Sequence, residues 1–132
     1  MFLTKEQIFA AKDLKREIVE IPEWSIDGVP GQVMVQELTA RERENFENSI
    51  EKEDGEKDYS NFHARAVAMT CITETGEKLF SEADVEQLAE KSLGVLLRIA
   101  DVAARISKLR SDDVEEARKN LSEGQSEGSN LG

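Results

Sequence analysis

The chain has one histidine and one cysteine, and neither lies at a spacing that favours catalysis or metal binding. His63 lies among apolar residues at the predicted start of a helix, with no second metal ligand or nucleophile at a matching distance. Cys71 lies further along the same apolar stretch, which is typical of a small core residue. We therefore expect a packed or capping histidine, a buried cysteine and no catalytic site.

The acidic residues between Glu51 and Asp58 resemble a calcium-binding loop in composition but not in spacing. Two lysines interrupt them, and the twelfth position counted from Asp54 is Arg65 instead of the required glutamate. No glycine-rich loop opens a predicted helix, so a phosphate cradle is not expected either. The sequence predicts neither a metal nor a cofactor.

Charge restricts the classes of partner. The chain has 28 acidic and 17 basic residues, a formal net charge of -11. A surface this negative repels phosphate backbones and anionic lipids, so neither nucleic acid nor a membrane is expected as a partner. No apolar run approaches the roughly 18 residues of a transmembrane helix, and the N-terminus does not resemble a signal peptide. A single cysteine favours a reducing cytoplasm.

Three helix starts are marked by a capping residue followed three positions later by a residue that can bond back to it. The first helix should end near Asp13 and the second near Glu53. The third should carry Val85, Leu88 and Ala89. The pairs are Thr4 with Gln7, Thr39 with Glu42, and Ser81 with Asp84.

A β-hairpin is predicted over residues 15–38. Residues 15–21 are rich in β-branched side chains, which is typical of a strand. Pro22 either ends that strand or places it at a sheet edge. Asp27-Gly28 is a favoured two-residue hairpin turn, and strand character resumes over residues 32–38.

Two later helices have unusually wide apolar surfaces. A helix that Ser60 caps and that runs to about Ile72 is apolar almost all round, so we expect it to be buried. Ser92 begins a long helix, Leu93 to Leu109, whose polar residues line one face. Its apolar arc exceeds the roughly 100° that a surface helix needs. It is either the central helix of the domain or a helix that reserves part of its surface for a partner.

These elements predict a mainly helical α+β domain over residues 1–110, with the hairpin packed on a bundle of four or five helices. Residues 111–132 carry six acidic and two basic groups and are rich in serine and glycine. We expect a short acidic helix and a disordered tail there.

The predicted partner-binding residues are apolar residues of the long helix and the only tryptophan. Tryptophan is enriched at interface hot spots, although packing against the hairpin would also explain it. Burial in the core is the open alternative for the helix residues. The candidates are Leu93, Val95, Leu96, Ile99, Val102, Ile106, Leu109 and Trp24.

Several short motifs occur in order along residues 1–121. They are Leu3-Thr4-Lys5 with Gln7, Pro22-Glu23-Trp24, Val33 to Thr39 with Arg41-Glu42-Arg43, Ala64 to Ala68, Gly76 to Ser81 with Asp84-Val85, and Lys91-Ser92. This ordered set resembles the tail assembly chaperones of long-tailed bacteriophages and prophages.

The resemblance implies a noncatalytic protein of the host bacterial cytoplasm. It implies that the chain binds the tape measure protein, a long helical protein prone to aggregation, and keeps it soluble until the tail tube forms. Tail tube protein and a second copy of the chain are further partners that it implies, and the mature virion should lack the chain. The sequence also leaves open an acidic DNA-mimic inhibitor, a structural tail completion subunit and an adaptor domain.

Overall fold

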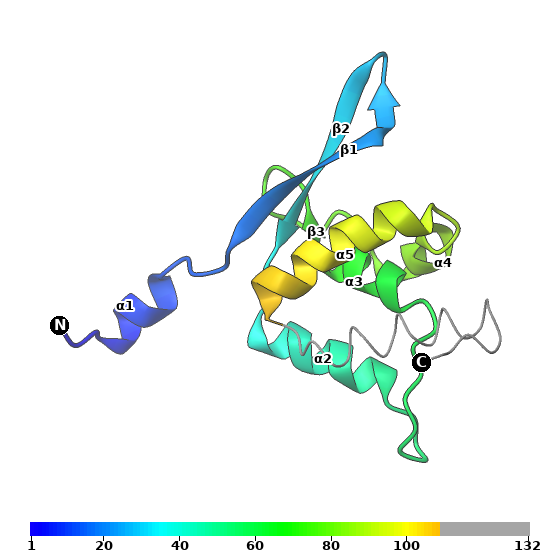
Figure 1. The fold of residues 1–132 in the computed structure, drawn as a ribbon. Helices are drawn as coiled ribbons and strands as arrows, with labels where there is room; N and C mark the ends of the chain where they lie inside the picture. The colour runs from blue at the N-terminus through cyan, green and yellow to red at the C-terminus, as the bar shows by residue number, and fades with distance from the viewer. Residues whose placement is uncertain (109–132) are drawn as a thin grey trace, which may run out of the picture.

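Two antiparallel strands, β1 (Arg16–Ile26) and β2 (Val29–Gln36), form a long hairpin in the computed structural model, which describes residues 1–108 (Figure 1). Asp27 and Gly28 connect them with φ angles of 51° and 79°. Two successive positive φ angles are what a two-residue turn needs to match the strand twist. The predicted hairpin and its turn are confirmed.

Pro22 does not end the first strand, because β1 continues through it to Ile26. Ile21 lies opposite Gly31 and Ile26 opposite Val29, so the residues between them form a bulge in β1. A proline has no N–H to donate and is tolerated at a bulge on an edge strand. The strand order β1-β2-β3 makes β1 an edge strand, which confirms the prediction that Pro22 lies at a sheet edge.

The third strand, β3 (Cys71–Ile72), corrects the expected length of the apolar helix. That helix, α3, spans Phe62–Thr70, and the chain then extends to pair antiparallel with β2. Cys71 pairs with Val35, and both side chains are fully buried. Burial against the hairpin thus replaces the last predicted helical turn. No side-chain hydrogen bond caps α3, because the Ser60 Oγ atom lies 2.6 Å from Asp58 Oδ1 instead.

The remaining helices begin where the capping residues predicted. All three capping boxes form, and Ser92 caps the long helix through the backbone N–H of Val95. The helices end earlier than expected: α1 spans Lys5–Ala10, α2 spans Ala40–Ile50 and α5 spans Leu93–Ser107. Between them, a 3-10 turn at Glu82–Asp84 leads into the short α4, Val85–Leu88.

The core lies where α5 contacts α3 and the inner face of the hairpin (Figure 1). Val19, Ile21 and Val35 contribute from the sheet, and Val67 from α3. A second cluster, around Phe46 and Phe62, joins α2 to α3. The architecture is α+β, with a three-stranded antiparallel sheet against helices. The acidic helix and tail predicted for residues 111–132 lie outside the described residues.

Candidate partner-binding surface

Four predicted partner-binding residues of α5 are core residues. Val95, Leu96, Ile99 and Ile106 are between 0% and 7% exposed, because α5 lies against both α3 and the sheet. A partner could not reach them without unpacking the domain, so their assignment to a client surface is corrected. The wide apolar arc belongs to a central helix at these positions.

The other predicted partner-binding residues of this helix are more exposed than those four or lie outside the described residues. Leu93, in the first turn of α5, is 41% exposed, and Val102 is partly buried against the core. Leu109 lies outside the described residues. Accessible apolar surface on α5 is therefore confined to its margins, and the larger accessible apolar groups lie elsewhere in the chain.

The polar face of α5 holds the hairpin. Arg98 donates two hydrogen bonds of 2.7 Å to the carboxylate of Glu23, and Arg105 donates one of 2.7 Å to Glu17. The bidentate bond from Arg98 lowers the pKa of Glu23 to about 2. Both carboxylates belong to β1, so the two arginines fix this strand against the helix at two points.

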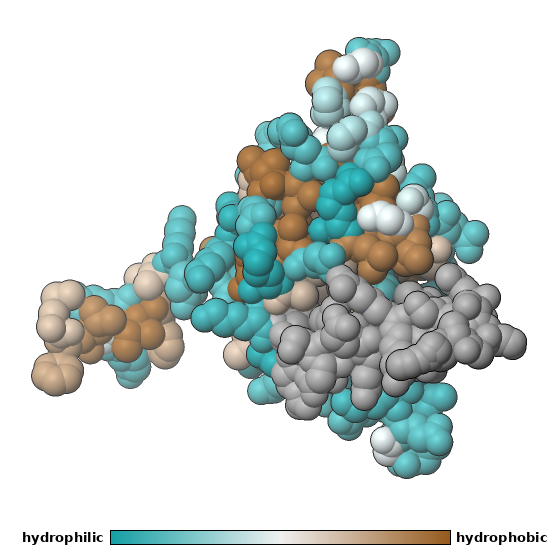
Figure 2. Space-filling view, viewed as in Figure 1, coloured by the Kyte–Doolittle hydropathy of each residue, from teal (hydrophilic) through white to brown (hydrophobic). Residues whose placement is uncertain are grey.

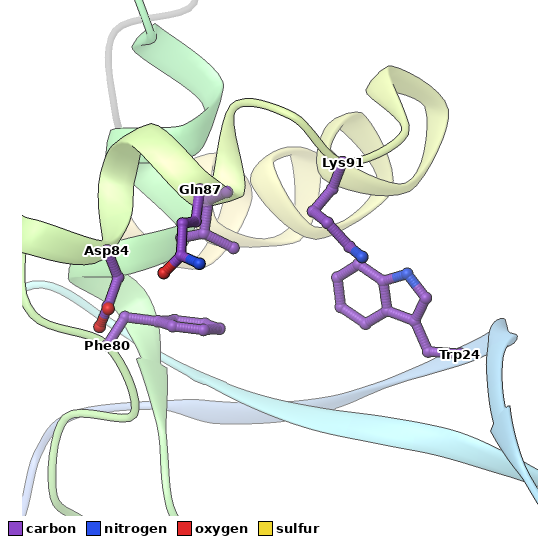
Figure 3. A pocket seen from close by; sticks show the side chains of 6 residues that line it. Trp24, Phe80, Asp84, Gln87 and Lys91 are labelled. Carbon is purple, nitrogen blue, oxygen red and sulfur yellow. The ribbon is translucent and has the colours of Figure 1, made fainter.

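Trp24 lines a groove between the hairpin and α4. The indole is half-buried and packs against the core, and the Lys91 Nζ atom lies 6.0 Å from the ring centroid, at the outer limit of a cation–π contact. Trp24 and Phe80 enter the space from different elements, while Lys91 extends over the indole (Figure 3). The opening measures about 380 Å³. We call it the Trp24 groove; it is lined by Trp24, Phe80, Asp84, Gln87, Leu88 and Lys91.

The bulge in β1 determines where Trp24 lies. Gly31 on β2 faces this bulge, and a Cβ atom added there would come within 2.4 Å of the Trp24 carbonyl oxygen. Only glycine permits this approach of the two backbones. The Ser25 hydroxyl also donates to the Pro22 carbonyl at 2.5 Å, within the bulge. Both alternatives considered for Trp24 therefore stay compatible with its position, since it packs on the core and also borders accessible space.

The most exposed apolar side chains lie in residues 1–10, which we call the N-terminal arm. Its helix, α1, is capped by Thr4 but contains no buried residue. Met1 and Phe2 are fully exposed and Phe9 is 79% exposed. The arm projects from the rest of the domain, with apolar groups along it (Figures 1 and 2). The sequence indicates an apolar side for this helix, but it does not show that residues 1–108 leave that side uncovered.

The hairpin tip is a second exposed apolar feature. Ile26 and Val29, on either side of the turn, are 72% and 65% exposed. They form a pair across the two strands beyond the bulge, away from the helices (Figures 1 and 2). These exposed β-branched residues add to the surface available for a partner.

The single histidine and the single cysteine, which could in principle act as reactive groups, are both packed inside the domain. His63 is buried, and its ring meets Phe62 edge-on with the centroids 5.3 Å apart. Burial raises the pKa of Cys71 to about 12, which disfavours the reactive thiolate. Within residues 1–108, no group of three or more histidine, cysteine, aspartate or glutamate side chains could hold a metal ion.

No family model, curated protein or solved structure matches this chain. Over the part that the structure describes, no helix is long and apolar enough to cross a membrane. What the protein does is therefore inferred from its own surface. The most exposed apolar side chains of that surface lie on the N-terminal arm and the hairpin tip, and the Trp24 groove adds a recess with apolar lining.

Proposed function

We propose that this chain is a tail assembly chaperone of a long-tailed bacteriophage or prophage, which binds the tape measure protein without catalysis. The observation that carries the proposal is the N-terminal arm, whose helix is stabilised by its cap although none of its residues is buried. A helix that exposes its apolar residues is suited to contact another apolar helix. The order of motifs along the sequence points to the tape measure protein as the client.

The charge of the chain suits a protein that holds an aggregation-prone client. A formal net charge of -11 keeps a complex with exposed apolar segments dispersed by electrostatic repulsion. The arm itself carries Lys5 and Glu6, so its apolar groups are accompanied by little charge. In this proposal the apolar arm binds the client, and the acidic remainder of the chain keeps the complex soluble. The complex would form in the host cytoplasm, and the chaperone would leave before the virion is complete.

Co-expression with the tape measure protein tests the proposal. The wild-type chain should move the tape measure protein from the insoluble to the soluble fraction and co-purify with it. A variant with both Phe2→Ser and Phe9→Ser should lose most of this effect. The matched control is Ile18→Ser, which removes an exposed apolar side chain of β1 outside the arm.

Three results would contradict the proposal. The first is a tape measure protein that stays insoluble with the wild-type chain, and the second is rescue that the arm variant retains in full. The third is the chain in purified virions in stoichiometric amount, which would favour a structural tail completion subunit. Competition with DNA for a basic protein would instead favour a DNA-mimic inhibitor.

A further inference from the structure

We propose that the N-terminal arm of one copy of this chain docks into the Trp24 groove of a second copy. This inference does not depend on the tape measure protein, because it concerns the purified chain alone. It unites two apolar surfaces of the same molecule that have no covering element in the described part of the chain. The arm supplies the projecting apolar side chains, and the groove supplies the recess.

The arm has the properties of a docking segment. Phe9 is 79% exposed and Ile8 is 52% exposed, and both belong to a helix that its capping box has already ordered. The capping box uses 2.9 Å and 3.1 Å hydrogen bonds between Thr4 and Gln7. An ordered segment loses less conformational entropy on binding than a disordered one. The apolar side chains of α1 are therefore presented in a form that is ready to bind.

The groove has the properties of a receptor for an aromatic or aliphatic side chain. Trp24, Phe80 and Leu88 are its apolar lining residues. Lys91 extends over the indole and Asp84 lies beside Phe80 (Figure 3). The groove's opening of about 380 Å³ is larger than one phenylalanine side chain. Aromatic side chains that enter aromatic-lined pockets are the usual centre of a protein interface.

Charge complementarity favours this pairing over a random apolar contact. The arm and its linker, residues 1–15, carry three lysines, Lys5, Lys12 and Lys15, against two acidic residues, Glu6 and Asp13. Residues 82–91, which form one side of the groove, carry four acidic groups and one lysine. The arm is thus a positive segment of a protein with a net charge of -11, and the groove margin is negative. Opposite potentials steer such partners together.

Geometry places the arm of the same molecule away from its own groove. The linker is held at the start of β1, where the backbone N–H of Lys15 donates to Glu37 Oε1 at 3.0 Å. Trp24 lies toward the other end of this strand, roughly 25 Å along it from Arg16. The arm and α4 lie on opposite sides of the domain (Figure 1). The arm that occupies a given groove should therefore come from a second copy of the chain.

Analytical ultracentrifugation and tryptophan fluorescence of the purified full chain test the inference. Trp24 is the only tryptophan, so its emission reports on the groove alone. Association should rise with concentration, and the emission of Trp24 should shift to shorter wavelength in parallel. Phe9→Ser in the arm and Gln87→Arg in the groove should each weaken association by about tenfold or more. The first removes the apolar side chain that docks, and the second places a larger, charged side chain in the groove and makes its margin less negative. Ile18→Ser should leave association unchanged.

Mixing the two variants separates docking between copies from docking within one. The Phe9→Ser chain keeps an intact groove and the Gln87→Arg chain keeps an intact arm. An equimolar mixture should therefore associate, although neither variant does so alone. Failure of the mixture to associate would overturn the proposal, as would a chain that stays monomeric at all concentrations. A Trp24 emission that responds to Phe9→Ser without any dependence on concentration would assign the groove to the arm of the same chain.

Discussion

Arg98 and Glu23 are joined by two parallel hydrogen bonds of 2.7 Å between the middle of α5 and the bulged part of β1. Arg98 lies on the polar face of a helix whose opposite face is core, so the pair connects a helix that packs in the core to the strand that carries Trp24. Arg105 and Glu17 repeat this connection nearer the start of the strand. These two contacts add to the buried packing of Val19, Ile21 and Val35 in holding the hairpin, and with it one side of the Trp24 groove, against the helices.

The Glu23–Arg98 contact predicts a specific pH dependence. The pKa of Glu23 in the folded chain is about 2, below the ordinary glutamate pKa of 4.5, because Arg98 bonds to the carboxylate. A lowered folded-state pKa contributes stability that is present above pH 4.5 and is lost as the pH falls toward 2. Glu23→Gln should therefore be less stable than wild type near neutral pH, and the difference should shrink across this interval.

Urea unfolding at a series of pH values measures that difference. Glu20→Gln is the matched control, because it removes an exposed carboxylate of the same strand that accepts from the Gln32 side chain and, within residues 1–108, from no arginine. A Glu23→Gln difference that stayed constant from neutral pH down to pH 2 would contradict the assigned cause.

Gly31→Ala should destabilise the protein and move Trp24. The added Cβ would lie 2.4 Å from the Trp24 carbonyl oxygen, a backbone atom that cannot yield without changing the bulge. Overpacking of this kind costs about 1–3 kcal/mol. The measurement is thermal unfolding together with Trp24 emission in the folded state. Gly94→Ala is the control, because its nearest neighbour would be Ser92 Oγ at 3.7 Å, and it should keep the wild-type emission.

Ile99→Ala and Leu93→Ala should separate core from surface on α5. Ile99 is fully buried, so its truncation should cost about 2–5 kcal/mol in the free energy of unfolding. Leu93 is 41% exposed, and its truncation should cost less than about 1 kcal/mol. Chemical denaturation of both variants measures this contrast. Equal, small effects would restore the idea that the whole apolar face of the helix is a partner surface.

Cys71 should resist thiol reagents in the folded protein. Its side chain is fully buried between α3 and β2, and burial raises its pKa to about 12, so almost no thiolate exists at neutral pH. Labelling with a chromogenic disulfide reagent should be slow in buffer and fast in denaturant. Rapid labelling of the native chain would show that β3 opens readily.

Local signals made much of the fold predictable. The capping boxes at Thr4, Thr39 and Ser81 depend on residues three apart, and the Asp27-Gly28 turn depends on two adjacent residues. Such contacts involve residues that are close in sequence, so a local pattern of residue types is enough to predict them. The starts of the helices and the hairpin were therefore accessible to sequence reasoning, and their ends were less so.

Features that depend on distant parts of the chain were not predictable. Cys71 leaves the helix because Val35, far away in sequence, offers a strand to pair with. Pro22 stays within β1 because a bulge opposite Gly31 accommodates it. Likewise, hydrophobic periodicity shows that a helix has an apolar side but not what covers it. For this reason the sequence predicts a partner surface on α5 and none on the arm.

Deletion of residues 1–10 should leave the stability of the domain unchanged. None of the residues of α1 is buried, and the linker contact from the Lys15 N–H to Glu37 remains after the deletion. The free energy of unfolding should therefore stay within about 0.5 kcal/mol of wild type, as for surface changes in general. The same deletion should abolish association between copies and rescue of the client, both of which require the arm. A large loss of stability would mean that the arm packs on its own domain, and its exposed side chains could not then serve a partner.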